Sequence, residues 1–462
     1  MKKIIGRRLT VLLMSIWVSN SFAATPGQEQ AVSIHLTNES LHNMSPKALS
    51  AHGQMLFDAK FTVLDGAGRP RATGAEVPVK TKRPSQQAFT RTSGPEANAC
   101  KGCHNDPVSG GAGEFVTNVF SSEGVVNADF ITLDKQFSNE RGTSHLFGSG
   151  LVELLAREMT AELQDIREQA VKKAKLEKTE VRVVLETKGI NFGFLTISSH
   201  GFIDINQIDG VDFDLVVRPF SQKGVFTSLR QFSINAMNSH HGMQASERYG
   251  EVWTHENDFD EDGYIDELTP ADITSLVVFQ AMLAAPEQEL PKDKELKDAA
   301  VKGQQYFSEA GCTSCHVAEL PLTSLSFAEP GPYNNAGTSR QTDGVYQLHF
   351  ELPSQGLRKD KNGIWYVPLF SDLKRHVIAD SQTPFLGNER LSQRFIANDV
   401  FITPRLWGVG SSAPYGHRGD ISTLREIIGH HGGDAKDSRQ AFEAFNEIQQ
   451  ASVIEFLLSL KL

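Results

Sequence analysis

The chain has 462 residues, a formal net charge of −11 and four cysteines. The acidic balance argues against nucleic acid as a partner, because binding to phosphates requires a basic surface. The length exceeds that of one small module and leaves room for two domains with additions.

The first 23 residues predict a cleaved secretory signal peptide. They start with basic residues that include Arg7 and Arg8, continue with an apolar run over 9–18, and end on Ser21-Phe22-Ala23. The apolar run is too short to cross a bilayer. We therefore expect a periplasmic protein that does not span the membrane, and loss of the four positive charges of this segment makes the mature chain more acidic.

All four cysteines lie in two copies of the pattern Cys-x-x-Cys-His, which are Cys100, Cys103 and His104, and Cys312, Cys315 and His316. This pattern is the attachment signature of c-type haem, in which both thiols bond the porphyrin and the histidine becomes the proximal iron ligand. A four-thiolate zinc site, a thioredoxin-like pair or a disulfide gives no reason for a histidine after both second cysteines. The sequence therefore predicts two covalently bound haem c groups, and export agrees with this, since haem is attached outside the cytoplasmic membrane.

The remaining elements predict two haem domains in tandem. Helices are expected at 49–57 and 299–307 before the two motifs, at 150–177, and at the C-terminal end over 452–460. Segments 181–185 and 192–198 flank Thr187-Lys188-Gly189 and predict a β-hairpin. We expect a mainly α protein with two class-I cytochrome c-like domains, 24–288 and 297–462, the first enlarged by a helix and β-hairpin insertion, with a linker at 290–296.

An internal repeat supports a duplicated haem domain. Residues 223–230 match 418–425 in spacing and type, and each block precedes an apolar helix that ends in two histidines, His240-His241 and His430-His431.

Residues 258–269 resemble a calcium-binding EF-hand loop. The loop supplies carboxylates at positions 1, 3, 5 and 9, a glycine at position 6 and a carbonyl at position 7, from Asp258, Asp260, Asp262, Asp266, Gly263 and Tyr264. Position 12, which is normally a glutamate that binds the ion, is Thr269. The last ligand would therefore be Glu267 or a water molecule. The alternative is an acidic turn that opens the helix after Pro270.

Five segments resemble the family of di-haem oxidoreductases related to bacterial di-haem cytochrome c peroxidases and to the di-haem enzymes that mature methylamine dehydrogenase. They are 94–100, 214–220, 240–244, 372–376 and the Pro-Tyr-Gly-His block at 414–420. The resemblance covers nearly the whole mature chain. It implies two haems, a reactive haem in the N-terminal domain and a glutamate that moves protons during peroxide cleavage.

The distal ligands decide which haem is reactive, because a six-coordinate iron only passes electrons. We call the haems of the first and second motifs haem 1 and haem 2. All eight methionines lie at or before Met282, so haem 2 has no methionine after its own motif. In the peroxidases, the distal methionine lies at a fixed spacing after the histidine of the Pro-Tyr-x-His block. The same spacing after His417 reaches His431. We therefore predict that His316 and His431 bind haem 2, with His430 as the alternative ligand, or with either histidine merely capping the helix before Gly432.

Haem 1 is predicted to be open or weakly ligated. In the repeat, Ala236 takes the position of His431, and Met237, His240 and His241 follow as candidates for the distal pocket. Candidates for the catalytic acid or base are Glu114 and Glu153, with Glu158 in the same helix.

These residues predict a periplasmic di-haem c-type oxidoreductase that is peroxidase-like. Haem 2 would take electrons from a periplasmic donor, a small cytochrome c or a cupredoxin, and haem 1 would reduce a small oxidant such as hydrogen peroxide. An oxidative reaction of haem 1 on an organic or protein substrate would use the same two haems. The alternatives are a di-haem electron-transfer cytochrome c without catalytic turnover and a gas-sensing haem module.

Overall fold

The computed structural model describes residues 26–67, 99–119, 139–259, 262–341, 345–389 and 392–462. The predicted signal peptide and Asp260 of the predicted calcium loop lie outside these residues. Within the described ranges, no helix is both long enough and apolar enough to cross a bilayer.

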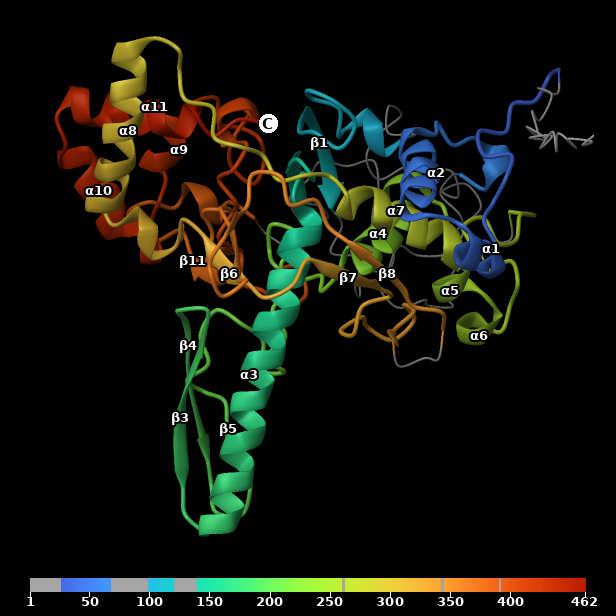
Figure 1. The fold of residues 1–462 in the computed structure, drawn as a ribbon, viewed down its shortest axis with the longest axis horizontal. Helices are drawn as coiled ribbons and strands as arrows, with labels where there is room; N and C mark the ends of the chain where they lie inside the picture. Colours follow the sequence, from blue (N-terminus) through green and yellow to red (C-terminus); the bar gives the residue numbers. More distant parts are fainter. Residues whose placement is uncertain (1–25, 68–98, 120–138, 260–261, 342–344, 390–391) are drawn as a thin grey trace, which may run out of the picture.

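The helix before the first motif, α2, packs on the turn at Cys100–Gly102. It belongs to a group of helices that Figure 1 shows together on one side of the body. Ser45 caps the start of α2, where Pro46 is preorganised for the first helical turn, and Thr269 caps α7 in the same way. The helices of this group are α1 (Asn38–Asn43), α2 (Pro46–Asp58), α4 (Leu229–Ala236), a π-helix (Met237–His241), α5 (Ser246–Tyr249), α6 (Glu251–Thr254) and α7 (Pro270–Ala281).

The second motif is surrounded by a second group of helices, at the opposite side of the body in Figure 1. Asp293 caps α8, and Asn446 caps α11 with a capping box. The helices are α8 (Lys294–Glu309), α9 (Leu424–Gly429), α10 (Lys436–Ala444) and α11 (Glu447–Leu458).

The two groups repeat one packing geometry. In α2, a Cβ added to Gly53 would lie 1.9 Å from the Ser275 carbonyl oxygen of α7. In α8, a Cβ added to Gly303 would lie 1.8 Å from the Ser452 carbonyl oxygen of α11. Each glycine thus lets one helix backbone approach another closely, so that the helix before each motif crosses its partner at the same place.

The predicted helix at 150–177 and the predicted hairpin are confirmed. They form α3 (Ser149–Glu177) and a three-stranded antiparallel sheet of β3 (Val181–Thr187), β4 (Ile190–Ile197) and β5 (Ile203–Asp204). The N-terminal turns of α3 are buried in the body, and the rest of the helix projects from it with the sheet along one side, as an arm (Figure 1).

The prediction of a mainly α fold was wrong. Besides the arm sheet, the described residues form four more small antiparallel sheets, which pair β1 (Gly113–Val119) with β2 (Asn139–Thr143), β6 (Leu320–Leu322) and β9 (Arg358–Lys359) with β10 (Trp365–Val367), β7 (Ser326–Glu329) with β8 (Leu348–Glu351), and β11 (Arg375–Val377) with β12 (Val400–Ile402). Most of these strands have two to four residues, too short for an alternating pattern to stand out in the sequence. The predicted domain ranges, 24–288 and 297–462, stay a prediction.

Candidate functional site

Both Cys-x-x-Cys-His motifs line one continuous cavity of about 830 Å³. This volume lies toward the upper end of the range of about 300–1,000 Å³ that is usual for ligand pockets. All four cysteines and both motif histidines, His104 and His316, contribute to the wall. Residues separated by more than two hundred positions in the chain therefore face the same space.

The second motif presents a matched pair of imidazoles. His316 donates its Nδ1–H to the Phe370 carbonyl at 3.1 Å, and His431 donates its Nδ1–H to the Ile427 carbonyl at 2.8 Å. Both rings line the cavity, and each keeps Nε2 available for a metal. Such backbone hydrogen bonds are the usual way in which a protein fixes the tautomer of a metal-binding histidine.

Burial keeps these two histidines neutral, as metal binding requires. It lowers the pKa of His316 to about 4, and the neighbouring His431 lowers it further. Burial also lowers the pKa of His431, although the Ile427 carbonyl opposes that change.

The first motif has a similar surrounding. Burial lowers the pKa of His104 to about 4, although backbone groups of Gly111 and Ser144 oppose it, and Nδ1 is buried without a hydrogen bond of good geometry. The Phe57 ring lies 6.0 Å from the His104 ring, and the Phe307 ring lies 6.1 Å from the His316 ring. Each motif histidine therefore lies beside a phenylalanine in the last turn of the preceding helix.

The walls opposite the two motifs differ at one position of the repeat. Cavity-lining residues of α4 correspond at a constant offset in the sequence to those of α9 and the turn after it, as Leu229 with Leu424, Phe232 with Ile427, Ser233 with Ile428, and Ala236 with His431. The second site thus has an imidazole where the first has a methyl group.

The structure brings the other predicted distal residues of the first site to the same wall. Met237, His240 and His241 form part of the π-helix that follows Ala236, and all three line the cavity. His241 Nε2 lies 3.5 Å from the Cys100 Sγ. Short π-helical turns often occur at functional sites, because they change the direction of a few side chains without ending the helix.

The glutamates predicted as catalytic groups do not line the cavity. Glu114 is exposed on β1. Glu153 is fully buried in α3, where it pairs with Arg157 at 2.5 Å and accepts a hydrogen bond from the Leu229 amide. Glu158 pairs with Lys188 on the arm.

Several polar residues of the cavity wall have no signal in the sequence. His145 and Arg405 lie in segments outside the regular elements, and no spacing connects them to either motif. His417, which the sequence does mark through the Pro-Tyr-Gly-His block, lines the cavity as well, and its Nε2 lies 2.9 Å from Asn388 Oδ1 and 3.6 Å from Glu389 Oε1.

Glu389 lies at the centre of a buried ionic cluster beside the cavity. It contacts the Arg141 guanidinium and lies 3.2 Å from Lys223 Nζ. Burial lowers the pKa of Lys223 to about 8, against the attraction of Glu389. The Lys223 ammonium also binds three backbone carbonyls of the segment that leads to β12, so the cluster joins residues of both halves of the chain.

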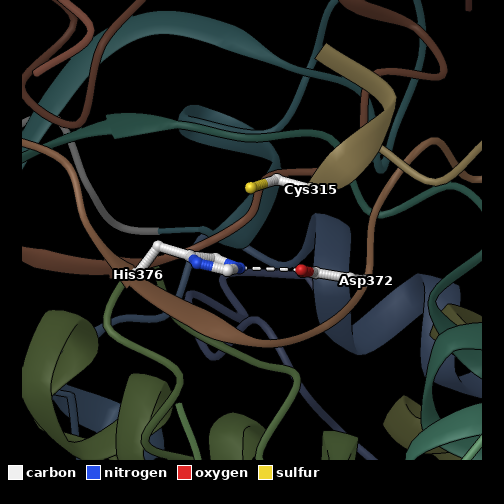
Figure 2. A group of neighbouring side chains, drawn as sticks. All are labelled: Cys315, Asp372 and His376. Carbon is white, nitrogen blue, oxygen red and sulfur yellow. Dashed lines mark hydrogen bonds and ion pairs between the residues drawn. The ribbon is translucent and has the colours of Figure 1, made fainter. Parts of the chain in front are cut away.

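Cys315, Asp372 and His376 form a group whose potential ligand atoms lie within 4.8 Å of one another (Figure 2). His376 Nε2 donates to Asp372 Oδ2 at 2.7 Å. Burial opposes the charged imidazole, but the hydrogen bonds to Asp372 and Cys315 raise the pKa of His376 to about 10. Because Cys315 belongs to the second haem motif, a thioether at this sulfur would leave two ligands, too few for a structural metal site.

The predicted calcium loop is held by hydrogen bonds between its own residues. The two carboxylate oxygens of Asp258 accept from the amides of Asp262 and Gly263 at 3.2 and 3.0 Å, and Asp262 accepts from the Tyr264 amide. Glu267 instead accepts from the Gln244 amide, and Thr269 caps α7. Calcium binding at this loop, with Asp266, stays a prediction.

No protein-family model matches the chain, and a search of curated proteins gives no match. Among solved structures, the chain is similar to the hydrazine synthase of Kuenenia stuttgartiensis, with 13% identity and a TM-score of 0.39 over 98% of this chain and 100% of that one. It is also similar to a MauG-like protein associated with microbial copper homeostasis, with 13% identity and a TM-score of 0.27 over 58% of this chain and 78% of that one. Both TM-scores are too low to establish a family.

Proposed function

We propose that the chain is a periplasmic di-haem c-type oxidoreductase with a peroxidase-like reaction. One observation carries the proposal: both Cys-x-x-Cys-His motifs line a single cavity, in which the wall opposite them provides His431 at one site and Ala236 at the other. The wall is mostly apolar and large enough for a macrocyclic cofactor. The donor set, two thiols and a neutral imidazole at each site, is the set that covalently attached haem requires.

The second site is proposed to transfer electrons. His316 and His431 would hold the iron, and their hydrogen bonds to the Phe370 and Ile427 carbonyls fix the orientation of the two rings. A small cytochrome c or a cupredoxin would deliver the electrons.

The first site is proposed to react with the oxidant. When bound, the haems supply the one-electron chemistry. Ala236, Phe226 and Phe232 line the cavity, and their apolar side chains would limit the access of water to the first site. Hydrogen peroxide would take up two electrons from the donor and two protons, its O–O bond would break, and two water molecules would form. His240 and His241, which line this part of the cavity, are the side chains proposed to exchange these protons.

A second candidate function is electron transfer without turnover. The observation in its favour is that Met237, His240 and His241 lie directly beyond Ala236, so one of them could close the first site as a sixth ligand. In that case both irons would be six-coordinate and peroxide would not react.

The proposal is tested by the haem content and the activity of the protein expressed with a cytochrome c maturation system. We expect two haems per chain that stay attached after denaturation, one in the Cys312→Ala/Cys315→Ala variant, and peroxide reduction with a reduced small cytochrome c. Haem that dissociates on denaturation would contradict covalent binding, and two attached haems without peroxide turnover would favour the electron carrier.

A further inference from the structure

A guanidinium that no carboxylate of the described residues neutralises faces the cavity where the two halves of the chain meet. Arg405 lines the cavity, and its Nε atom is buried with no hydrogen-bond partner in the described residues. The next residue, Leu406, packs against the core around the second motif, while Trp407 belongs to the core around the first. The side chain therefore reaches the cavity between the two sites.

In the described part of the chain, no carboxylate pairs with Arg405. Burial alone lowers its pKa to about 10, with no opposing effect from a carboxylate. The buried arginines elsewhere differ from it: Arg230 binds Glu247 and Glu329, and Arg141 binds Glu389. Arg405 is partly buried and its Nε atom is fully enclosed, and a cation in such surroundings is costly unless it is paired.

The neighbouring histidine cannot provide the missing charge. His145 Nε2 donates to the Trp407 carbonyl at 2.8 Å, which leaves Nδ1 as a buried acceptor with no partner in the described residues. Burial, with a contribution from Arg405, lowers the pKa of His145 to about 3, so the ring is neutral. Arg405 and His145 together present donor N–H groups and one acceptor nitrogen to the cavity.

We propose that Arg405 is the centre of an anion-binding site between the two haem sites. The acceptor nitrogen of His145 beside it takes no part in binding, because an anion has no proton to donate to it. The ligand chemistry is that of a carboxylate, which a planar guanidinium binds through paired N–H groups. Two sources could provide it, the carboxylate side chains of the bound tetrapyrrole or a free anion from solution. If the carboxylate belongs to haem, the inference rests on the proposed function.

The test is spectroelectrochemical titration of the holoprotein at low ionic strength, with and without added sulfate. Arg405→Gln is expected to lower the midpoint potential of one haem, because loss of the positive charge disfavours the more negative reduced state. Arg405→Lys keeps the charge and is expected to keep the potential. The control, Arg358→Gln, removes an exposed guanidinium outside the cavity that pairs with Glu319, and both potentials should be unchanged.

The sulfate series separates the two sources. If the cofactor supplies the carboxylate, sulfate leaves the wild-type potentials unchanged. If a free anion binds, sulfate shifts a wild-type potential, and Arg405→Gln abolishes this response. Arg405→Met is the second uncharged variant should Arg405→Gln fail to accumulate.

The inference is overturned if the uncharged variants keep both potentials with no response to sulfate, or if Arg405→Lys shifts them as far as Arg405→Gln does. Haem content is measured on every sample first. Fewer than two attached haems in the wild type would refute the proposed function, whereas two haems with unaltered potentials would refute only the anion site.

Discussion

At the scale of single residues, the difference between the two sites reduces to His431 and Ala236. Ala236 ends α4 and His431 follows two residues after the end of α9, and the hydrogen bond from His431 to the Ile427 carbonyl fixes the imidazole. This correspondence follows from the repeat in the sequence. His145 and Arg405 could not be found in the same way, because their importance depends on which loops meet at the cavity.

Exchanging these two residues should exchange the ligation of the two irons. We expect His431→Ala to make haem 2 high-spin and Ala236→His to make haem 1 low-spin, with both haems still attached, as measured by optical and EPR spectra. His430→Ala is the matched control, since the His430 ring stacks on Phe385 at 4.1 Å and does not line the cavity. A spectrum of His431→Ala identical to that of the wild type would refute the ligand assignment.

Replacing Glu153 tests whether this residue stabilises the fold or performs catalysis. Glu153→Gln leaves the partly buried Arg157 without its counter-charge, and we expect a loss of about 3–5 kcal/mol in the free energy of unfolding. Urea denaturation measures this, and the exposed Glu114→Gln is the control with unchanged stability and activity. Lost turnover with unchanged stability in Glu153→Gln would instead assign it a catalytic role.

At the scale of elements, two close helix crossings, α2 with α7 and α8 with α11, support the two sites. The N-terminal segment adds to the first of them by binding α7. The helices before both motifs were predicted from apolar spacing and are found as α2 and α8. The packing of α8 on α11 depends on Gly303, whose importance is visible only once the Ser452 carbonyl lies against it.

Gly303→Ala should separate α8 from α11, because the added Cβ meets backbone that cannot move alone. We expect a loss of about 1–3 kcal/mol in the free energy of unfolding, measured by thermal or urea denaturation. Gly429→Ala is the control: a Cβ there meets nothing within 4 Å, so the variant should be as stable as the wild type or up to about 1 kcal/mol more stable. Equal effects of both substitutions would contradict the crossing as the cause.

The attachment of the N-terminal segment to α7 should depend on pH. The hydrogen bond to Asp272 raises the pKa of His35, so this contribution is complete below 6.5 and is lost as the pH rises through the raised value. Burial opposes ionisation of Asp272, but hydrogen bonds from His35 and His52 lower its pKa to about 2, so its contribution is complete above 3.8 and is lost as the pH falls toward 2.

Protection of the Leu36 amide, which donates to Asp272 at 2.9 Å, should therefore be greatest between about pH 4 and 6.5 and should decrease on both sides. Hydrogen exchange corrected for the intrinsic pH dependence measures it. Asp272→Asn should remove both the protection and its pH dependence, and an unchanged profile in that variant would show that other groups hold the segment.

At the scale of the whole molecule, the local elements were more predictable than the architecture. The paired motifs, the repeat and the arm hairpin are local in the sequence. Short patterns around Cys100, His316 and Lys188 are therefore enough to identify them. The sheet of β11 and β12 and the shared cavity arise from contacts between distant segments. They could not be predicted from local patterns, and the same holds for the burial of Glu153, a candidate catalytic residue that pairs with Arg157 away from the cavity.

The low-temperature EPR spectrum of the ferric holoprotein tests the central claim most directly, which is that the two sites differ in the sixth ligand of iron. The account predicts one high-spin signal from the site with Ala236 and one low-spin signal from the site with His431, in the presence or absence of calcium. Two low-spin signals that persist in both conditions and after half-reduction would contradict an open first site and leave the chain an electron carrier.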